Sequence, residues 1–374
     1  MIFDIAKDEL VKSLSIVMKG VSTHFTLPIY SCVLISAQDG AITLHTADSE
    51  TFVKSTTPAF IEEEGQAVIP AKLFNDIVKS FPNEAVRVQT AGQSNQAIVS
   101  CSSSSFTINA FQPEDFPSFP EVQSSSQITI PSKSAEQMVK SVSYALSTDI
   151  NRPIMTGILL EIANGTITMV ATDSHRVAKI QKFLNDEADG ISVVVPGSIF
   201  RDVVNSASLE DSLTIGYTEN QIIFTFGSTS FVTRRIEGNF PNYQRVFPTE
   251  HTTSFRVPTA QLIDAIKRIR ILVNASPLKN SSIKLSISPE EGMVVISANF
   301  VDLGAGVERI PATIEGEKLD ISFNPGYILD GLSAVITDET VAEFTTNARP
   351  GVFRTAQNDE NTDFRYLIMP VRSN

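Results

Sequence analysis

Residues 171–176 read ATDSHR and place Asp173, Ser174 and His175 side by side. These are the residue types of a hydrolytic triad, in which the His must bond both the Ser and the acid. Adjacent residues of an extended chain point to opposite faces, so the three side chains cannot converge. A triad would need distant partners, yet the sequence holds four His and no Gly-x-Ser-x-Gly motif. We therefore expect no catalytic residue here.

The composition is that of a large globular chain. Its 374 residues are too many for one ordinary core and predict two or three domains. The net charge of −13 argues against a protein that grips nucleic acid by bulk charge. His and Cys are too sparse for ligand spacing, and no phosphate-binding Gly-x4-Gly-Lys-Ser/Thr loop is present, so we expect no metal and no cofactor.

Three features predict a cytoplasmic protein. The opening residues MIFDIAKDEL contain an early acid and no long apolar core, so no signal peptide is expected. No apolar run approaches the ~18 residues needed to span a membrane, so no membrane partner is expected. The two cysteines, Cys32 and Cys101, cannot build a disulfide framework and are expected to be free thiols.

Comparison of the sequence with itself reveals a unit of about 125 residues. Residues 27–50 match residues 152–175, and both read Pro-Ile, strand, turn, strand and then Asp-Ser. Residues 67–80, AVIPAKLFNDIVKS, match residues 193–206, VVVPGSIFRDVVNS. A fainter third copy begins with FRVPTAQLIDAIKRI and accounts for the rest of the chain.

The repeat gives the Asp-Ser-His stretch a different meaning. The first copy has Asp48, Ser49 and Glu50 at the matching place. The Asp-Ser pair thus belongs to the repeated scaffold and ends a strand. His175 is particular to the second copy, which favours a structural turn with a local addition.

Each copy predicts two helices separated by strands. Apolar residues recur at helical spacing, as in Leu10, Leu14 and Val17. Alternating runs predict antiparallel strands, with Asn164-Gly165 as a hairpin turn. Six helices are expected, at residues 7–20, 71–81, 132–147, 197–208, 259–274 and 325–335. This is an α+β pattern. The linkers predict three domains, at residues 1–122, 127–248 and 253–374.

Charge is unevenly distributed along the chain. The six expected helices carry a net charge of +4, which leaves −17 for everything else. A surface that is weakly positive on its helices and acidic elsewhere would guide a polyanion without gripping it. For any single Lys, an ordinary solvated helix face is the alternative.

Three motifs together resemble one family. The tail FRYLIMPVR at 364–372, ATDSHR at 171–176 and FPNYQRVFP at 240–248 strongly resemble the bacterial sliding clamp, the beta subunit of DNA polymerase III. The resemblance extends over the whole chain in length, motif order and three-part organisation. It implies three repeated DNA-clamp domains, each with two helices on antiparallel sheets, forming half of a six-domain homodimeric ring around duplex DNA. The implied function is that of a processivity factor for DNA replication, not of an enzyme.

The resemblance also implies partners and a peptide pocket. The partners would be double-stranded DNA read without sequence preference, the replicative DNA polymerase, the clamp loader, repair polymerases and mismatch-repair proteins. Short motifs of the protein partners would enter a pocket between the second and third domains. One wall would consist of Arg152, Met155, Thr172, Ser174, His175, Arg176, Val177, Pro241, Val246 and Phe247. The other would consist of Asn324, Tyr327, Pro350, Leu367, Ile368, Met369, Pro370, Val371 and Arg372.

The residue types suit such a pocket. Apolar side chains with a Met form an adaptable groove for Leu or Phe. Arg and His at the rim can bond backbone or carboxylate groups of a ligand. His175 could instead be a satisfied strand-end His, and the apolar tail could be merely a last core strand.

The family pattern carries over to DNA contacts and to a subunit interface. DNA contacts would fall to Lys12, Lys19, His24, Lys72, Lys79, Lys140, Arg152, Lys267, Arg268 and Arg270. The interface would place Ile271 and Leu272 of one chain against Phe106 and Ile108 of the other, although all four could be core residues.

Three residues bear on how closely the family pattern holds. Ser174 stands where many members have Gly, which could alter the backbone of the pocket. His24 stands where a basic residue often contacts DNA, and it would be mostly neutral at pH 7. Asp149, close to Arg152 in the chain, would repel phosphate.

Two other classes remain open. A hydrolase that uses Ser174 and His175 predicts that Ser174→Ala abolishes activity. A clamp predicts a mild effect of that change, and weaker peptide binding when Met369 or Arg372 is truncated. A secreted repeat adhesin, favoured by the Ser-rich stretches and the acidity, predicts an export signal that the sequence lacks.

Overall fold

The computed structural model describes residues 1–21, 27–90, 95–121, 124, 126–184, 190–277, 282–335, 337–356 and 362–371. They form two compact units, which we describe separately. The first comprises residues 1–135 and 202–235, and the second comprises residues 136–201 and 236–374.

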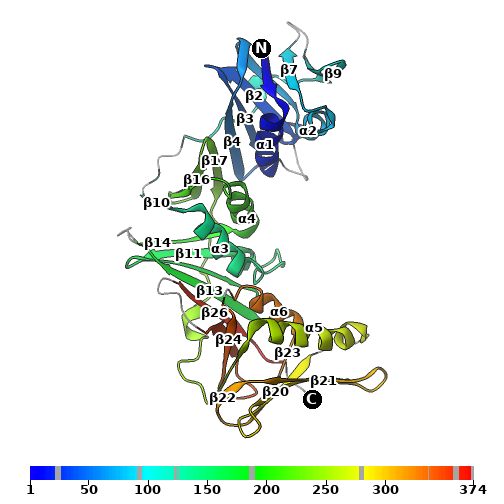
Figure 1. Cartoon of the computed structure of the whole chain (residues 1–374). Coiled ribbons are helices and arrows are strands. Elements are labelled where there is room, and N and C mark those ends of the chain that lie inside the picture. Colours follow the sequence, from blue (N-terminus) through cyan, green and yellow to red (C-terminus); the bar gives the residue numbers. More distant parts are fainter. Residues whose placement is uncertain are drawn as a thin grey trace. The chain divides into compact units, whose positions relative to one another are not determined.

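All six expected helices are present (Figure 1). They are α1 (Lys7–Val17), α2 (Ala71–Ser80), α3 (Ser132–Ser143), α4 (Gly197–Ser206), α5 (Thr259–Ala275) and α6 (Pro325–Leu332). The predicted α+β class is therefore confirmed.

The described strands recur in three repeats of nine, eight and nine strands, and the second repeat has no described counterpart of the short strand between the fourth strand and the one before the second helix. The first repeat holds β1 (Ile2–Ala6), β2 (Cys32–Gln38), β3 (Ala41–Ala47), β4 (Thr51–Pro58), β5 (Phe60–Glu63), β6 (Gly65–Pro70), β7 (Ala85–Thr90), β8 (Gln96–Cys101) and β9 (Ser104–Asn109). The second holds β10 (Ser126–Pro131), β11 (Gly157–Ala163), β12 (Thr166–Thr172), β13 (Arg176–Phe183), β14 (Ile191–Pro196), β15 (Ser212–Tyr217), β16 (Gln221–Phe226) and β17 (Thr229–Arg234). The third holds β18 (Thr253–Pro258), β19 (Ile283–Ser288), β20 (Met293–Phe300), β21 (Gly304–Pro311), β22 (Thr313–Gly316), β23 (Leu319–Phe323), β24 (Glu339–Phe344), β25 (Gly351–Thr355) and β26 (Thr362–Ile368).

The first unit contains two antiparallel sheets. One has the order β5-β1-β7-β8-β9, and the other has the order β10-β15-β16-β17-β4-β3-β2-β6. In the larger sheet β17 of the second repeat pairs with β4 of the first. Helix α1 lies against β3, β4 and α2, and it buries Leu10, Leu14 and Val17, the residues whose spacing predicted it.

The second unit is built the same way. A nine-stranded sheet has the order β14-β11-β12-β13-β26-β25-β24-β18-β22, and a four-stranded sheet has the order β21-β20-β19-β23. Here β13 of the second repeat pairs with β26 of the third, with Val177 opposite Leu367. Each large sheet thus crosses a repeat boundary, and the second repeat contributes strands to both units.

The two Asp-Ser pairs end their strands in the same way. Asp48 follows β3, and its Oδ1 accepts backbone N–H groups two and three residues later, at 2.8 and 2.6 Å. Asp173 follows β12 and accepts the corresponding N–H groups at 2.9 and 3.1 Å. Asp side chains commonly close turns in this manner. The prediction that the pair is part of the scaffold is confirmed.

The expected hairpin turn is also confirmed. Asn164 and Gly165 connect β11 to β12 with φ values of 52° and 68°. Ala163 pairs directly with Thr166 across the turn. Two consecutive positive φ angles are what a two-residue hairpin requires, and Asn-Gly supplies them at low cost.

His45 is buried in the core of the first unit. It lies on β3 with 5% of its surface exposed, edge-on to Phe116 and Phe119 at ring distances of 5.1 and 5.3 Å. Its Nε2 has no hydrogen-bond partner among the described residues. Burial, with a smaller contribution from nearby Lys54, lowers the pKa of His45 to about 4.

This burial predicts acid sensitivity of the first unit. Between pH 6.5 and 4 the unfolded chain binds a proton at His45 that the folded chain does not, so stability falls as pH falls through this window. The expected loss is about 3 kcal/mol. Urea unfolding of the parent and of His45→Gln, each at pH 7 and pH 4.5, measures it. The parent should lose more stability than the variant, and equal losses would contradict the prediction.

Candidate functional site

The turn between β12 and β13 is a compact structure in the second unit. Ser174 has a φ of +79°, in the left-handed region that favours glycine. Its backbone N–H donates to Thr172 Oγ1 at 3.2 Å, and that hydroxyl donates to the carbonyl of Arg176 at 2.7 Å. The turn is therefore closed by its own side chains.

The hydroxyl of Ser174 is bonded away from the imidazole beside it. Arg152 Nη1 donates to Ser174 Oγ at 2.9 Å, and Ser174 Oγ donates to Met155 Sδ at 3.3 Å. Arg152 Nε donates to Asp149 at 2.9 Å. Among the described residues no hydrogen bond joins Ser174 to His175. The neighbours in sequence do not form the nucleophile–base pair that a hydrolase requires.

The side chain of Arg176 is a buried hub. It is 8% exposed, and its Nε, Nη1 and Nη2 donate to Asp173, to Asp330 and to the carbonyl of Tyr144 at 2.9, 2.6 and 2.6 Å. Its guanidinium carbon lies 4.4 Å from the ring centre of Tyr327. Burial raises the pKa of Tyr144, so its hydroxyl remains neutral beside the guanidinium. All three nitrogens of Arg176 are engaged, so it acts as framework and not as the rim donor that the sequence suggested.

An apolar cluster lies beside this hub. Val177 and Leu367 face each other on β13 and β26 and are buried with Tyr243, and Phe247 packs against them. The Tyr243 hydroxyl donates to Glu161 Oε2 at 2.6 Å and so anchors the segment that carries Phe247. Burial and this hydrogen bond raise the pKa of Tyr243 to about 12.

The last residues of the described chain complete the region. Met369 N–H donates to the carbonyl of His175 at 2.9 Å, and its side chain is 43% exposed. Val371 N–H donates to the carbonyl of Ser322 at 2.8 Å. The His175 ring stacks on Tyr327 with centroids 6.4 Å apart. Exposed Met and His side chains thus border buried apolar ones.

Comparison with known proteins identifies the family. Three family models of the DNA polymerase III beta subunit match the chain. The N-terminal domain matches residues 1–120, the central domain matches 129–242 and the C-terminal domain matches 244–372. The chain belongs to the bacterial sliding clamp family.

Relatives of this clamp cover its whole length. It is 33% identical to the beta sliding clamp of Bacillus subtilis and 30% identical to that of Staphylococcus epidermidis, over 99% of each chain. A crystal structure of the Bacillus subtilis sliding clamp superimposes with a TM-score of 0.94 at 31% identity, and both chains are fully covered. The Pseudomonas aeruginosa clamp, solved with griselimycin bound, superimposes with a TM-score of 0.92 at 27% identity, again with full coverage.

Most residues expected to line the peptide pocket of the clamp fall in one region. The contacts above connect Arg152, Met155, Thr172, Ser174, His175, Arg176, Val177, Phe247, Tyr327, Leu367 and Met369. Ile368 is fully buried opposite Arg176 and is part of the core. Asn324 caps α6 by accepting the N–H of Gly326 at 2.8 Å. Val246, Pro370 and Val371 adjoin these residues in the chain. Pro241 follows Phe240, which packs on the apolar cluster, and Pro350 precedes Gly351, which pairs with Ile368. Arg372 lies outside the described residues.

Sequence reasoning missed three residues that hold this region. Asp149 pairs with Arg152, and Tyr144 and Asp330 bind Arg176. Asp149 was expected only to repel phosphate. No pattern in the sequence relates Tyr144 or Asp330 to Arg176, because they come from segments far apart in the chain.

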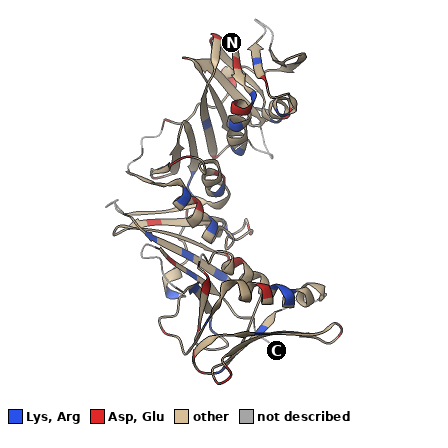
Figure 2. Cartoon of the chain, in the orientation of Figure 1, with Lys and Arg blue, Asp and Glu red and all other residues tan. Residues whose placement is uncertain are grey.

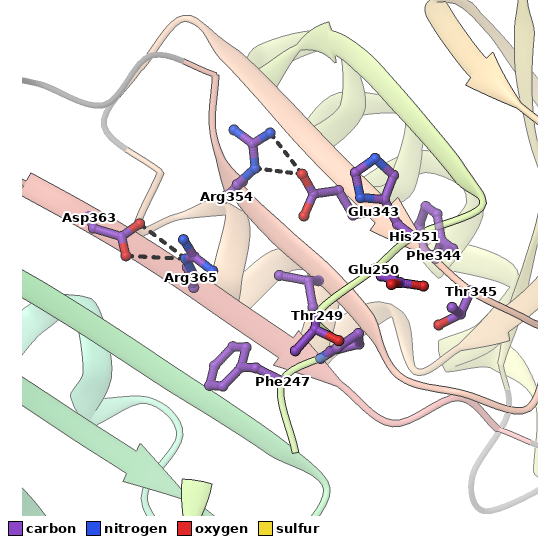
Figure 3. A pocket seen from close by; sticks show the side chains of 12 residues that line it. Phe247, Thr249, Glu250, His251, Glu343, Phe344, Thr345, Arg354, Asp363 and Arg365 are labelled. Atoms are coloured by element: carbon purple, nitrogen blue, oxygen red, sulfur yellow. Dashed lines mark hydrogen bonds and ion pairs between the residues drawn. The ribbon is translucent and has the colours of Figure 1, made fainter. Parts of the chain in front are cut away.

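A polar pocket of about 250 Å³ lies on the same sheet (Figure 3). Phe247 and the residues that follow it form one side of the pocket, and β24, β25 and β26 form the floor. Arg354 donates to Glu343 at 2.7 Å, and Arg365 donates to Asp363 at 3.1 Å. Each cation is therefore matched by its own carboxylate, and we assign no ligand to this pocket.

The helices of the clamp carry basic residues together with acidic ones (Figure 2). Among the described residues no ion pair involves Lys12, Lys79, Lys267 or Arg270. The other expected DNA contacts are paired: Lys19 with Asp202, Lys72 with Asp76, Lys140 with Glu136, Arg152 with Asp149 and Arg268 with Glu308. His24 lies outside the described residues. Exposed pairs of this kind are weak and can exchange partners.

The expected interface residues differ in exposure. Phe106 on β9 is 42% exposed and Ile271 on α5 is 68% exposed. Ile108 is buried in the sheet, and Leu272 is half-buried over Gly306 on β21. Phe106 and Ile271 thus present apolar surface, whereas Ile108 supports it from within.

The described residues contain neither a metal-ligand cluster nor a membrane-spanning helix. No group of three or more His, Cys, Asp or Glu side chains is arranged to hold a metal ion there. None of the helices in the described ranges has the length and apolar character to cross a membrane.

The hydrogen bonds of Arg176 predict that it contributes far more to the free energy of unfolding than a surface arginine on the same sheet. Arg176→Met should lower the free energy of unfolding by about 3–5 kcal/mol, because it leaves the largely buried carboxylate of Asp173 and the carbonyl of Tyr144 without their donor. The control is Arg365→Met. Arg365 is also paired with an Asp, but its side chain is 48% exposed, so the expected loss is below about 1 kcal/mol. Urea unfolding followed by circular dichroism compares the two, and equal losses would contradict the framework role.

Proposed function

We propose that this clamp acts as a processivity factor. Copies join head to tail into a homodimeric, six-domain ring that encircles duplex DNA and slides along it. The ring tethers the replicative polymerase through a peptide groove, the region around Ser174 and Met369. The clamp loader and repair proteins use the same groove. The domains would span residues 1–122, 127–248 and 253–374. We further propose a cytoplasmic protein with no catalytic activity of its own.

The pairing of strands between repeats carries this proposal. At the first boundary β4 pairs with β17, and at the second boundary β13 pairs with β26. In repeat order β13 is the equivalent of β4, and β26 is the equivalent of β17. The same two edges therefore meet at both boundaries.

The same pairing pattern leaves two corresponding strand edges open, one in the third repeat and one in the first. In the third repeat the equivalent of β4 is β21, the outer strand of the four-stranded sheet. In the first repeat the equivalent of β17 is β9, the outer strand of the five-stranded sheet. Open strand edges are normally protected or paired. The third junction is completed if β21 of one chain pairs with β9 of another, and such head-to-tail contacts generate a ring when they close.

Apolar side chains at these edges support the contact. Phe106 on β9 and Val307 on β21 are 42% and 49% exposed. Ile271, on the helix packed against β21, is 68% exposed. Large apolar side chains on a free surface are typical of subunit interfaces.

The charge distribution supports sliding on DNA. Helix cations such as Lys12 and Lys267 are unpaired within the described chain, while the chain as a whole carries −13. Few phosphate contacts give weak binding without sequence preference. A ring retained by topology needs no more than this.

The region around Ser174 and Met369 supports peptide binding. Buried apolar residues border exposed Met and His side chains, which is the composition of an adaptable groove for a short apolar motif. The Ser174 hydroxyl is bonded to Arg152 and Met155, and this arrangement supports a binding role over nucleophilic catalysis.

Retention on DNA tests the ring directly. Labelled clamp is loaded onto nicked circular DNA with its loader and ATP, half the sample is linearised, and both halves are passed through a sizing column. The clamp should remain with the circles and be lost from the linear molecules, because a ring can slide off a free end. Equal loss from both forms, with an active loader, would exclude encirclement.

The interface is tested by placing a charge in it. Ile271→Asp should convert the dimer to monomers at micromolar concentration, because an unpaired carboxylate would be buried there. Sedimentation velocity reads the mass. Leu209→Asp is the control, since Leu209 is 83% exposed in the first unit and lies at neither open edge. A monomeric control, or an Ile271→Asp variant that stays dimeric, would count against this interface.

A further inference from the structure

The internal repeat isolates what is special about Ser174. Ser49 occupies the same place in the first repeat, after an Asp that closes the same turn. Ser174 has a positive φ, and Ser49 does not. The backbone of the turn is common to both copies, and the left-handed serine belongs to the second copy alone.

The side-chain contacts differ in the same way. Ser174 Oγ joins Arg152 and Met155 at 2.9 and 3.3 Å. The matching positions of the first repeat are Leu27 and Tyr30, and Leu27 has no polar side-chain atom to offer. The bridge through Ser174 is therefore not part of the repeated scaffold.

The left-handed conformation makes the bridge informative. A residue with a Cβ is disfavoured at a φ of +79°, and glycine would adopt it without strain. A serine kept in such a conformation requires a compensating interaction, and strained residues of this kind gather at binding sites. Its two hydroxyl bonds supply that interaction.

The bridge also determines what Arg152 can bind. Nε is held by Asp149 and Nη1 by Ser174, while Nη2 has no hydrogen-bond partner among the described residues. Asp149 already balances the charge of the guanidinium. A single free nitrogen on a neutralised pair suits a carbonyl oxygen better than a carboxylate, which would face Asp149.

We infer that Ser174 is a positioning residue that sets the specificity of the peptide groove. Its hydroxyl holds Arg152 and Met155 in place for a linear peptide that offers an apolar side chain next to a carbonyl oxygen. The thioether of Met155 adapts to the side chain, and Arg152 donates to the carbonyl. This inference rests on the proposed peptide-binding function.

The test uses a fluorescein-labelled synthetic peptide with two Leu, one Phe and blocked termini. Its affinity for the full-length clamp is measured by fluorescence anisotropy. Ser174→Ala keeps the Cβ but removes the hydroxyl, and it should weaken binding about five-fold, the equivalent of one hydrogen bond. Ser174→Gly should weaken binding at least as much, although it relieves the backbone. Ser49→Ala is the matched control and should bind as the parent does.

A double-mutant cycle separates positioning from a general structural effect. In an Arg152→Ala background, Ser174→Ala should weaken binding much less than in the parent, because only Met155 is left for the hydroxyl to position. Undiminished, independent losses from the two changes would overturn the inference.

The outcomes distinguish this inference from the function on which it rests. A parent clamp that is retained on circular DNA but does not bind the peptide would remove the groove function, and the inference with it. If the parent and Ser174→Ala bind the peptide equally tightly, the groove function stays supported and only the role of Ser174 is overturned.

Discussion

The burial of one guanidinium, that of Arg176, is the constraint on which the site depends. A charge taken out of water is costly unless every donor finds an acceptor, and here Asp173, Asp330 and the carbonyl of Tyr144 supply them. These acceptors lie in the β12–β13 turn, on α6 and just after α3. One side chain therefore fixes three elements relative to the first residue of β13. The exposed His175, next to it in sequence, takes its position from the same bonds.

The apolar half of the site follows from a different principle. Val177 and Leu367 meet because β13 and β26 share a sheet across a repeat boundary. The segment carrying Phe247 is held over them by Tyr243, whose hydroxyl reaches Glu161. The groove that we propose here would combine a floor of two paired strands with side chains that can adjust. Such a groove would suit the recognition of several related peptides better than of one rigid ligand.

Much of this fold could be predicted from sequence, for identifiable reasons. Helical periodicity located the first helix of each copy, and the repeat located the second helices and the Asp-Ser turn. Asn164-Gly165 marked its hairpin. The pairing of strands from different repeats could not be predicted from local sequence patterns, because β4 and β17 are far apart in the chain. The partners of Arg176 could not be predicted for the same reason, since Tyr144 and Asp330 are also distant from it in sequence. Without them Arg176 was expected at the rim of a pocket. Phe106 and Ile108 lie two residues apart, on the same face of β9, yet Ile108 is buried and Phe106 is 42% exposed. This difference depends on the elements that cover each position, so it could not be read from the alternation of the strand.

The shared sheets also impose an order on assembly. During synthesis β13 emerges long before β26, so the middle of the nine-stranded sheet stays incomplete until residues 362–368 have been made. Until then the nascent chain carries an unpaired strand edge flanked by apolar residues such as Val177. Pairings of such long sequence separation form slowly and leave time for wrong contacts. Although the sequence is repeated, the copies cannot fold one at a time, because the second copy completes its sheet only with a strand of the third.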